Sequence, residues 1–140
     1  MKTHLITGAA GFIGSALSDK ILSSGDNVVG IDNFLLGNKE SINLLKNNYE
    51  NFNFIESDLS IEKEVPNLIK KLSIFNFDIV WHLAANSDIR GYENGLKVDF
   101  NNTFMTTINT GMIMESLGID EIVFSSSSAA IGNTDIAIAE

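Results

Sequence analysis

The 140-residue sequence contains no cysteine and a single proline. The lack of cysteine excludes disulfides, thiolate metal sites and a cysteine nucleophile, and it fits a cytoplasmic protein in a reducing compartment. Positive charge is also scarce, because nine basic residues face eighteen acidic ones and leave a formal charge of −9. A surface of that sign does not attract nucleic acid or an anionic membrane. We therefore expect neither partner, and we expect no metal site because no carboxylate or histidine cluster has ligand spacing.

Long hydrophobic runs are missing as well, so no segment has the length and apolarity needed to cross a membrane. The apolar, small-residue stretch after Met1 superficially resembles a signal peptide, but three glycines interrupt it and Asp19-Lys20 stand where it should continue. The chain is 44% hydrophobic, which suffices for the core of one domain of this length. We expect residues 1–140 to form one domain.

Three of the eleven glycines fall in one short stretch, Thr7 to Ser15. An apolar pair precedes it, and apolar residues then recur at every fourth position from Ile13 to Ile21, which predicts a strand, a tight turn and a helix. Such a turn, followed by the amino end of a helix, is a natural seat for a pyrophosphate. The alternative is a loop that glycines merely punctuate. The three glycines have the spacing Gly-x-x-Gly-x-x-Gly: Gly8, Gly11 and Gly14.

An acidic residue follows the second predicted strand, Val28 to Ile31. Asp32 stands 24 residues after Gly8, close to the spacing at which a carboxylate binds the adenosine ribose of a dinucleotide. Because a carboxylate repels a 2′-phosphate, Asp32 favours NAD over NADP. The alternative for Asp32-Asn33 is an ordinary turn after a strand.

Strands and helices alternate along the rest of the chain, and the strands are nearly continuous in apolar residues. This pattern predicts an α/β fold with a doubly wound parallel sheet of the Rossmann type, strand order 3-2-1-4-5, in three α/β/α layers. We expect strands at residues 5–6, 28–31, 52–55, 77–85 and 121–124, and helices at residues 13–21, 41–48, 65–72 and 100–117.

In this fold the carboxyl ends of the strands share one edge, where ligands bind. The glycine loop, Asp32, Asp58 and residues 83–85 and 125–128 should therefore meet there. Each has an alternative: Asp58 can cap a turn, the serine run can be a flexible loop, and Asn102 can be a surface residue. His82 lies inside an apolar strand, where a hydrogen-bonded core histidine is the favoured interpretation, and Trp81 should also belong to the core.

Together these residues resemble the extended short-chain dehydrogenase/reductase superfamily, specifically its NAD-dependent nucleotide-sugar epimerase/dehydratase branch, of which UDP-glucose 4-epimerase is a member. The resemblance spans almost the whole chain. Six motifs in order carry it: Thr7-Gly8-x-x-Gly11-x-x-Gly14, Asp32-Asn33, Asp58-Leu59, His82-Leu83-Ala84-Ala85, Asn102 with Thr107, and Phe124-Ser125-Ser126-Ser127.

The resemblance implies NAD as the cofactor and a role for each matching position. Phe12 and Ile13 would lie over the pyrophosphate, Asp32 and Asn33 would bind the adenosine ribose, and Asp58 with Leu59 would frame the adenine. Ser127 matches the hydroxyl that hydrogen-bonds the sugar oxygen during oxidation. The implied cofactor-binding set is Gly8, Gly11, Phe12, Ile13, Gly14, Asp32, Asn33, Asp58, Leu59, Leu83, Ala84, Ala85, Asn102 and Ser125.

The family's chemistry also needs a tyrosine and a lysine four residues later, which together remove the hydroxyl proton of the sugar. Tyr49 and Tyr92 are followed at that distance by Asn53 and Leu96, so neither begins a Tyr-x-x-x-Lys motif. In the family this pair lies downstream of the serines, as does the substrate lobe. We therefore expect the chain to be the NAD-binding part, truncated before both, and to bind cofactor without efficient turnover.

Subfamily signals favour a 4-epimerase acting on a nucleotide sugar. Ser128-Ala129 occupy the positions where 4,6-dehydratases carry Asp-Glu, and the loop from Asn86 to Arg90 is similar to an epimerase-like subgroup. Residues 130–132, however, depart from the usual Val-Tyr-Gly. The alternatives are a non-catalytic dinucleotide-binding module or partner subunit and a 4,6-dehydratase; Asp32 disfavours an NADP-dependent reductase. The family often dimerises through helices, which leaves a homodimer through the helix near Phe100 open.

Overall fold

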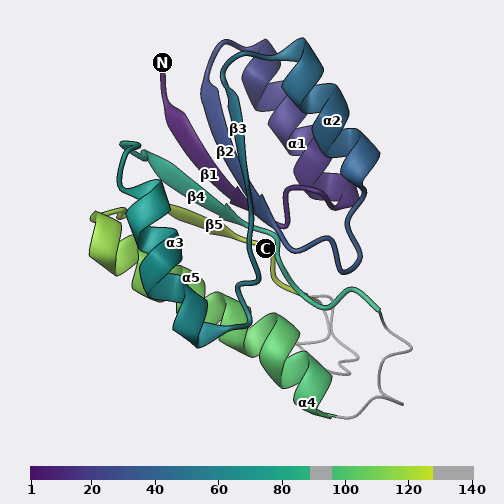
Figure 1. Cartoon of the computed structure of the whole chain (residues 1–140), viewed down its shortest axis with the longest axis vertical. Coiled ribbons are helices and arrows are strands. Elements are labelled where there is room, and N and C mark those ends of the chain that lie inside the picture. The colour runs from purple at the N-terminus through teal and green to yellow at the C-terminus, as the bar shows by residue number, and fades with distance from the viewer. Residues whose placement is uncertain (89–95, 128–140) are drawn as a thin grey trace, which may run out of the picture.

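The computed structural model describes residues 1–88 and 96–127 and contains a five-stranded parallel sheet (Figure 1). The strand order is β3-β2-β1-β4-β5, and all neighbouring strands are parallel. This order confirms the predicted doubly wound topology. The strands are β1 (Thr3–Thr7), β2 (Asn27–Asp32), β3 (Phe52–Glu56), β4 (Ile79–His82) and β5 (Ile122–Phe124).

Helices cover both faces of the sheet and complete the three predicted layers. Figure 1 shows α1 and α2 together on one side, with α3 and α5 on the other. The helical elements are α1 (Phe12–Ser23), α2 (Lys39–Asn48), the 3₁₀ turn η1 (Glu62–Glu64), α3 (Val65–Leu72), α4 (Leu96–Asp99), the π-helical segment η3 (Phe100–Met105) and α5 (Thr106–Leu117). Within the ranges 1–88 and 96–127, no helix has both the length and the apolar character that a membrane crossing requires.

The fourth strand is shorter than its apolar sequence predicts, because β4 ends at His82 rather than at Ala85. The Leu83 N–H is shared between the carbonyl and the hydroxyl oxygen of Thr7, at 3.2 Å from each, and the Ala84 N–H donates to that hydroxyl oxygen at 3.2 Å. The last residue pair between β1 and β4 is Thr7 with His82. The apolar character of the sequence does not reveal that the Thr7 hydroxyl accepts hydrogen bonds directly after this pair.

The buried face of α1 also differs from the predicted apolar stripe. Ile13, at the start of that stripe, is 62% exposed, whereas Gly14, Ser18, Ile21 and Leu22 are buried. Small residues let the helix approach the glycine loop closely, and the Ser18 hydroxyl is satisfied by the Gly14 carbonyl at 2.7 Å. The helical period was therefore predicted correctly, and so was the carboxyl end of the stripe, where Ile21 is buried and Leu17 packs against the apolar core; only Ile13 departs from it.

The long helix begins at Leu96, not at Phe100, and its first part is irregular. One carbonyl of the π-helical turn η3, that of Thr103, accepts the N–H of Thr106 and also the hydroxyls of Thr106 and Thr107, both hydroxyls at 2.8 Å. At the other end, Gly118 closes α5 with a left-handed conformation (φ 67°), which confirms the predicted stop.

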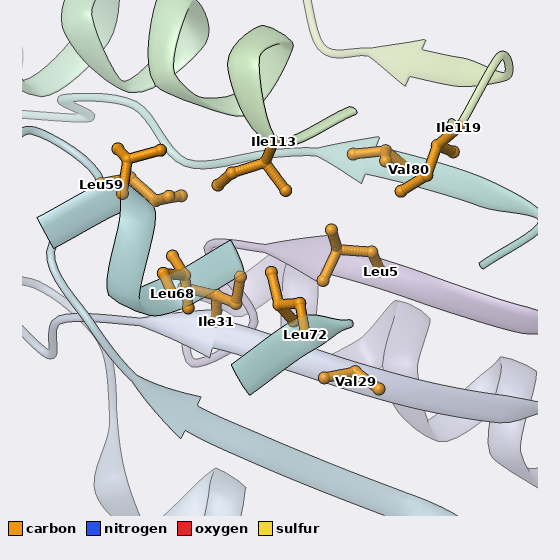
Figure 2. Packing of buried hydrophobic residues seen from close by; sticks show 10 residues of the cluster. Leu5, Val29, Ile31, Leu59, Leu68, Leu72, Val80, Ile113 and Ile119 are labelled. Carbon is orange, nitrogen blue, oxygen red and sulfur yellow. The ribbon is translucent and has the colours of Figure 1, made fainter. Parts of the chain in front are cut away.

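Two apolar clusters fill the spaces between the layers. One lies between the sheet and the α3/α5 side and includes Leu5, Val80, Leu68 and Ile113 (Figure 2). The other contains buried residues of β1, β2, α1 and α2. Trp81 is only partly buried against this second cluster, and its indole N–H donates to His4 Nδ1 at 2.9 Å. The two clusters hold the carboxyl ends of β1 to β4 in fixed positions.

Candidate functional site

A cavity of about 540 Å³ opens at the carboxyl edge of the sheet. It is built mainly by the loops that follow β1, β2, β3 and β4, together with the π-helical segment η3. Every residue predicted to bind the cofactor lines it: Gly8, Gly11, Phe12, Ile13, Gly14, Asp32, Asn33, Asp58, Leu59, Leu83, Ala84, Ala85, Asn102 and Ser125. The structure thus brings the set together, while the binding role of each residue stays a prediction.

Two glycines at the junction of β1 and α1 have no room for a side chain: Gly8 in the loop and Gly14 in the first turn of α1. Gly8 has a φ of 72°, and a Cβ there would lie 2.9 Å from the backbone nitrogen of Ala84. A Cβ on Gly14 would collide with the Gly8 carbonyl oxygen. The loop is also tied to β2, because the N–H groups of Gly8 and Ala9 donate to the Ile31 carbonyl at 2.9 and 3.1 Å.

The amino end of α1 faces this cavity without any competing acceptor from its own side chains. Gly11 is the N-cap and provides no side-chain cap, and the first turn carries no acidic residue. The first N–H groups of a helix lack intrahelical partners, and they form the positive end of its dipole. The Phe12 and Ile13 side chains are exposed at this end, at 93% and 62%. The arrangement fits an anionic group such as a pyrophosphate.

Asp32 has a fixed orientation at the end of β2. Its Oδ2 accepts the N–H of Ala10 at 3.0 Å, and its Oδ1 accepts the N–H of Phe34 at 2.7 Å. Phe34 adopts a positive φ of 58°, so the loop bends sharply directly after the carboxylate. An ionised carboxylate has further lone pairs, so Asp32 can still accept hydrogen bonds from a vicinal diol.

Asp58 caps a turn, which was the alternative to ligand binding, and it also lines the cavity. Its Oδ1 accepts the N–H of Ser60 at 2.8 Å, and its carbonyl accepts the N–H of Ile61 at 3.2 Å. The turn orients the carboxylate at the cavity wall, beside Leu59. A carboxylate accepts more than one hydrogen bond, so both roles are compatible.

His82 is a buried and satisfied histidine, as the favoured interpretation predicted. It is 3% exposed, and burial lowers its pKa to about 4, so the ring is neutral near pH 7. Its Nδ1 lies 2.8 Å from the Thr7 hydroxyl and its Nε2 lies 3.0 Å from the Thr107 hydroxyl. The network therefore ties the residue before the glycine loop to α5.

The two shorter contacts of His82 favour a proton on Nε2, whereas a third hydroxyl, that of Thr110, lies 3.3 Å from Nδ1 and gives its own proton to the Thr106 carbonyl. The Thr7 oxygen accepts the N–H groups of Leu83 and Ala84, which leaves its proton for His82 Nδ1. The Thr107 proton goes to the Thr103 carbonyl, so Thr107 accepts the proton of His82 Nε2. Sequence reasoning placed Thr7 in the motif but missed this hydroxyl, since its partners stand 75 or more positions away.

The serine segment after β5 is only partly described. Ser125 lines the cavity, and its N–H donates to the His82 carbonyl at 3.2 Å. Ser127, predicted as the active-site hydroxyl, is exposed and is not among the lining residues. Ile89, Arg90, Tyr92, Ser128, Ala129 and residues 130–132 lie outside the described residues.

Several lining residues were not predicted. Leu35 and Leu36, in the loop after Asp32, form an apolar rim and are 64% and 60% exposed. Asn86 also lines the cavity, and its side-chain amide donates to Asp99 at 2.8 Å. The apolar rim could have been predicted from the sequence, because two adjacent leucines stand in a loop. No pattern in the sequence indicates that the Asn86 side chain lines the cavity.

Three comparisons with known proteins agree with this geometry. A protein-family model described as the NAD dependent epimerase/dehydratase family matches residues 4–140. A putative UDP-glucose 4-epimerase of Methanocaldococcus jannaschii is 33% identical over 127 residues, which cover 91% of this chain and 38% of that protein.

Solved structures give the same result. The UDP-glucose 4-epimerase of Thermotoga maritima, solved with UDP-glucose, superposes with a TM-score of 0.81 at 26% identity, covering 97% of this chain and 41% of its own. The Bordetella bronchiseptica enzyme WbmH, solved with NAD+, superposes with a TM-score of 0.76 at 28% identity, covering 94% of this chain and 41% of its own.

The chain therefore spans about two fifths of the length of the proteins it matches. Within that span the match is nearly continuous, and it includes the glycine loop, the acid after β2 and the segment after β4. On this evidence the chain belongs to the NAD-dependent epimerase/dehydratase family.

Proposed function

We propose that this chain binds NAD and is the cofactor-binding part of a nucleotide-sugar 4-epimerase. One observation carries the proposal: a cavity at the carboxyl edge is bordered by glycines whose positions have no room for a Cβ and by a fixed carboxylate, Asp32. The glycines let a diphosphate approach the backbone, and Asp32 suits the unphosphorylated ribose of NAD.

The proposed chemistry is a transient oxidation of the sugar. Bound NAD would supply a hydride acceptor for C4 of the sugar and return the hydride to the opposite face. Ser127 would hydrogen-bond the reacting hydroxyl, and Asn102 would pack beside the cofactor. The tyrosine and lysine that complete the family's chemistry have no counterpart in the 140-residue sequence, so we expect binding without efficient turnover.

The substrate class comes from the same family resemblance. The Thermotoga maritima relative was solved with UDP-glucose, which supports a nucleotide sugar as the substrate of the complete enzyme. In this chain Ser125 lines the cavity and the two serines after it are exposed, and we expect the sugar to meet the cofactor on this side.

A homodimer through the α4–η3–α5 helix is part of the proposal. Exposed apolar side chains recur at every fourth position along it, and the rings of Phe100 and Phe104 stack at 5.2 Å. Sedimentation of the chain and of Phe104→Asp would test the pairing, because a dimer through this face should dissociate in the variant. The stripe is Leu96, Phe100, Phe104, Ile108 and Met112, between 41% and 88% exposed.

Thermal unfolding with NAD, with NADP and without ligand tests the cofactor proposal. NAD at about 100 times its Kd should add roughly 2.7 kcal/mol to the free energy of unfolding, and NADP should add less. Asp32→Ala should remove the preference between the two. Asp120→Ala is the matched control, because Asp120 precedes β5 at the opposite edge of the sheet. A cooperatively folded chain that neither cofactor stabilises would refute the proposal.

The second candidate is a non-catalytic dinucleotide-binding module or partner subunit. The 140 residues contain no Tyr-x-x-x-Lys motif, which is compatible with this candidate. Both candidates predict NAD binding, and they differ in chemistry. Incubating the NAD-loaded chain with UDP-glucose and following NADH absorbance separates them, since even slow hydride transfer supports the epimerase. The 4,6-dehydratase alternative would be revealed by water loss from the sugar, measured by mass spectrometry.

A further inference from the structure

Asn109 is the most deeply buried polar side chain of α5 and makes one unusual contact. It is 0% exposed, and its Nδ2 donates to the carbonyl of Leu59 at 2.7 Å, fifty residues away in the sequence. Among the described residues, its Oδ1 is the one buried side-chain oxygen or nitrogen without a hydrogen-bond partner. Asn109 does not line the cavity, whereas Leu59 does.

The unpaired oxygen shows that stability alone does not explain an asparagine here. A buried acceptor without a partner loses its hydration and gains nothing in return. Leucine has the same branched shape as asparagine, and it would bury two methyl groups at this position instead. Of the two residues, only asparagine can donate a hydrogen bond to the Leu59 carbonyl. Asparagine and leucine at this position should therefore differ in how firmly they hold that carbonyl.

The Leu59 carbonyl and side chain are both held by the same face of α5. The Leu59 side chain is 4% exposed and belongs to the apolar cluster that contains Ile113, as Figure 2 shows. Ile113 lies four residues after Asn109, one turn along the helix. Asp58, the preceding residue, closes the turn by accepting the Ser60 N–H. Asn109 thus fixes the carbonyl of the Leu59–Ser60 peptide, and the N–H of that same planar group donates to the Asp58 carboxylate.

We propose that Asn109 is a positioning residue for the adenine end of the dinucleotide site. It holds the turn of residues 58–60 against α5, so that the Asp58 carboxylate faces the exocyclic amino group of the purine. This inference rests on the proposed function, in which Asp58 and Leu59 frame the adenine. It extends that function to a residue that has no contact with the ligand.

The chemistry of the purine provides a direct readout. A carboxylate accepts a hydrogen bond from the 6-amino group of adenine, whereas the 6-oxo group of hypoxanthine has no hydrogen to donate and repels it. The ratio of the Kd values for nicotinamide hypoxanthine dinucleotide and NAD therefore reports where the Asp58 carboxylate lies. A residue that only stabilises the fold would weaken both ligands equally and leave the ratio unchanged.

Titration calorimetry with both dinucleotides on the wild-type chain and on Asn109→Leu is the test. We expect the preference for adenine to fall roughly three- to tenfold, the effect of one lost hydrogen bond. The melting temperature should change by only a few degrees, because the unpaired oxygen disappears together with the bond. Ile113→Val is the matched control: it loosens the same cluster and should leave the ratio unaltered.

The outcomes separate this inference from the proposed function. If the wild-type chain binds neither dinucleotide, the proposed function fails and this inference falls with it. If the wild-type chain prefers NAD and Asn109→Leu keeps that preference, this inference alone is wrong. Should Asn109→Leu fail to fold, Asn109→Ala with the same two ligands decides. In an Asp58→Ala background, which has no side-chain acceptor, Asn109→Leu should change the ratio no further, and an additional change would contradict action through Asp58.

Discussion

Two strands of the sheet, β2 and β5, differ sharply in how they are covered. β2 has a neighbouring strand on each side, and four of its six residues are buried, with α1 and α2 packed on one face and the α3/α5 cluster on the other. β5 is an edge strand, and all three of its residues are exposed: Ile122 by 45%, Val123 by 40% and Phe124 by 50%. The outer face of the helix that precedes β5 is equally apolar and open.

This difference separates the proposed cofactor half from the proposed substrate half. The glycine loop follows β1 and Asp32 ends β2, two strands whose residues are mostly buried. The serines stand at the end of β5, where apolar surface remains open to a partner or to further chain. We therefore expect cofactor binding to be sensitive to small changes around β1 and β2, and the β5 side to tolerate them.

The largest expected effect comes from adding one methyl group to the glycine loop. In Gly14→Ala the new Cβ would collide with the Gly8 carbonyl, and the contact is with backbone that cannot move aside. We expect a loss of about 3 kcal/mol or more in the free energy of unfolding and at least a tenfold weaker affinity for NAD. Urea unfolding and calorimetric titration measure the two quantities.

Gly111→Ala is the control on the open side. Gly111 is in α5, and a Cβ there would meet nothing within 4 Å. We expect a gain of about 0.5 to 1 kcal/mol, because alanine is the better helix former. If both substitutions were harmless, the glycine loop would not be the rigid cradle described above.

The glycine spacing was readable from the sequence because a strand, a turn and a helix are local. The same holds for the alternation of elements, which predicted the sheet order. Long-range contacts were not readable: the inward face of α1 is set by the approach of Gly14 to Gly8, and β4 ends where Thr7 accepts two N–H groups. No periodicity records which side chain across the sheet supplies a hydrogen bond, and Asn109 was missed for that reason.

His82 connects the β1–α1 glycine loop, through Thr7, to α5, through Thr107. Its burial predicts that the free energy of unfolding depends on pH. In the folded chain its pKa is lowered to about 4 by burial, against about 6.5 when unfolded. Below pH 6.5 the unfolded chain therefore gains a proton that the folded chain does not, so stability is complete above that pH and falls as pH drops to 4. The loss should reach at most about 3 kcal/mol, and urea unfolding at each pH measures it.

His82→Gln isolates this contribution from the acidic residues, which titrate in the same range. The glutamine amide can still donate to the Thr107 hydroxyl but does not titrate. Its stability should consequently fall less than that of the wild-type chain between pH 7 and pH 4, with NAD affinity following the same trend because Thr7 connects His82 to the glycine loop. Parallel curves for the two proteins would rule out His82 as the source.

The smallest expected effect is on the free energy of unfolding when valine is replaced by alanine, once on β2 and once on β5. Val28 on β2 is 0% exposed, and Val123 on β5 is 40% exposed. Val28→Ala should cost about 2 kcal/mol, because it leaves a cavity in a packed cluster, whereas Val123→Ala should cost about 0.5 kcal/mol or less. Urea unfolding of both variants gives the ratio directly. Equal costs would mean that β5 is covered in solution, and sedimentation would then show whether a second copy of the chain covers it.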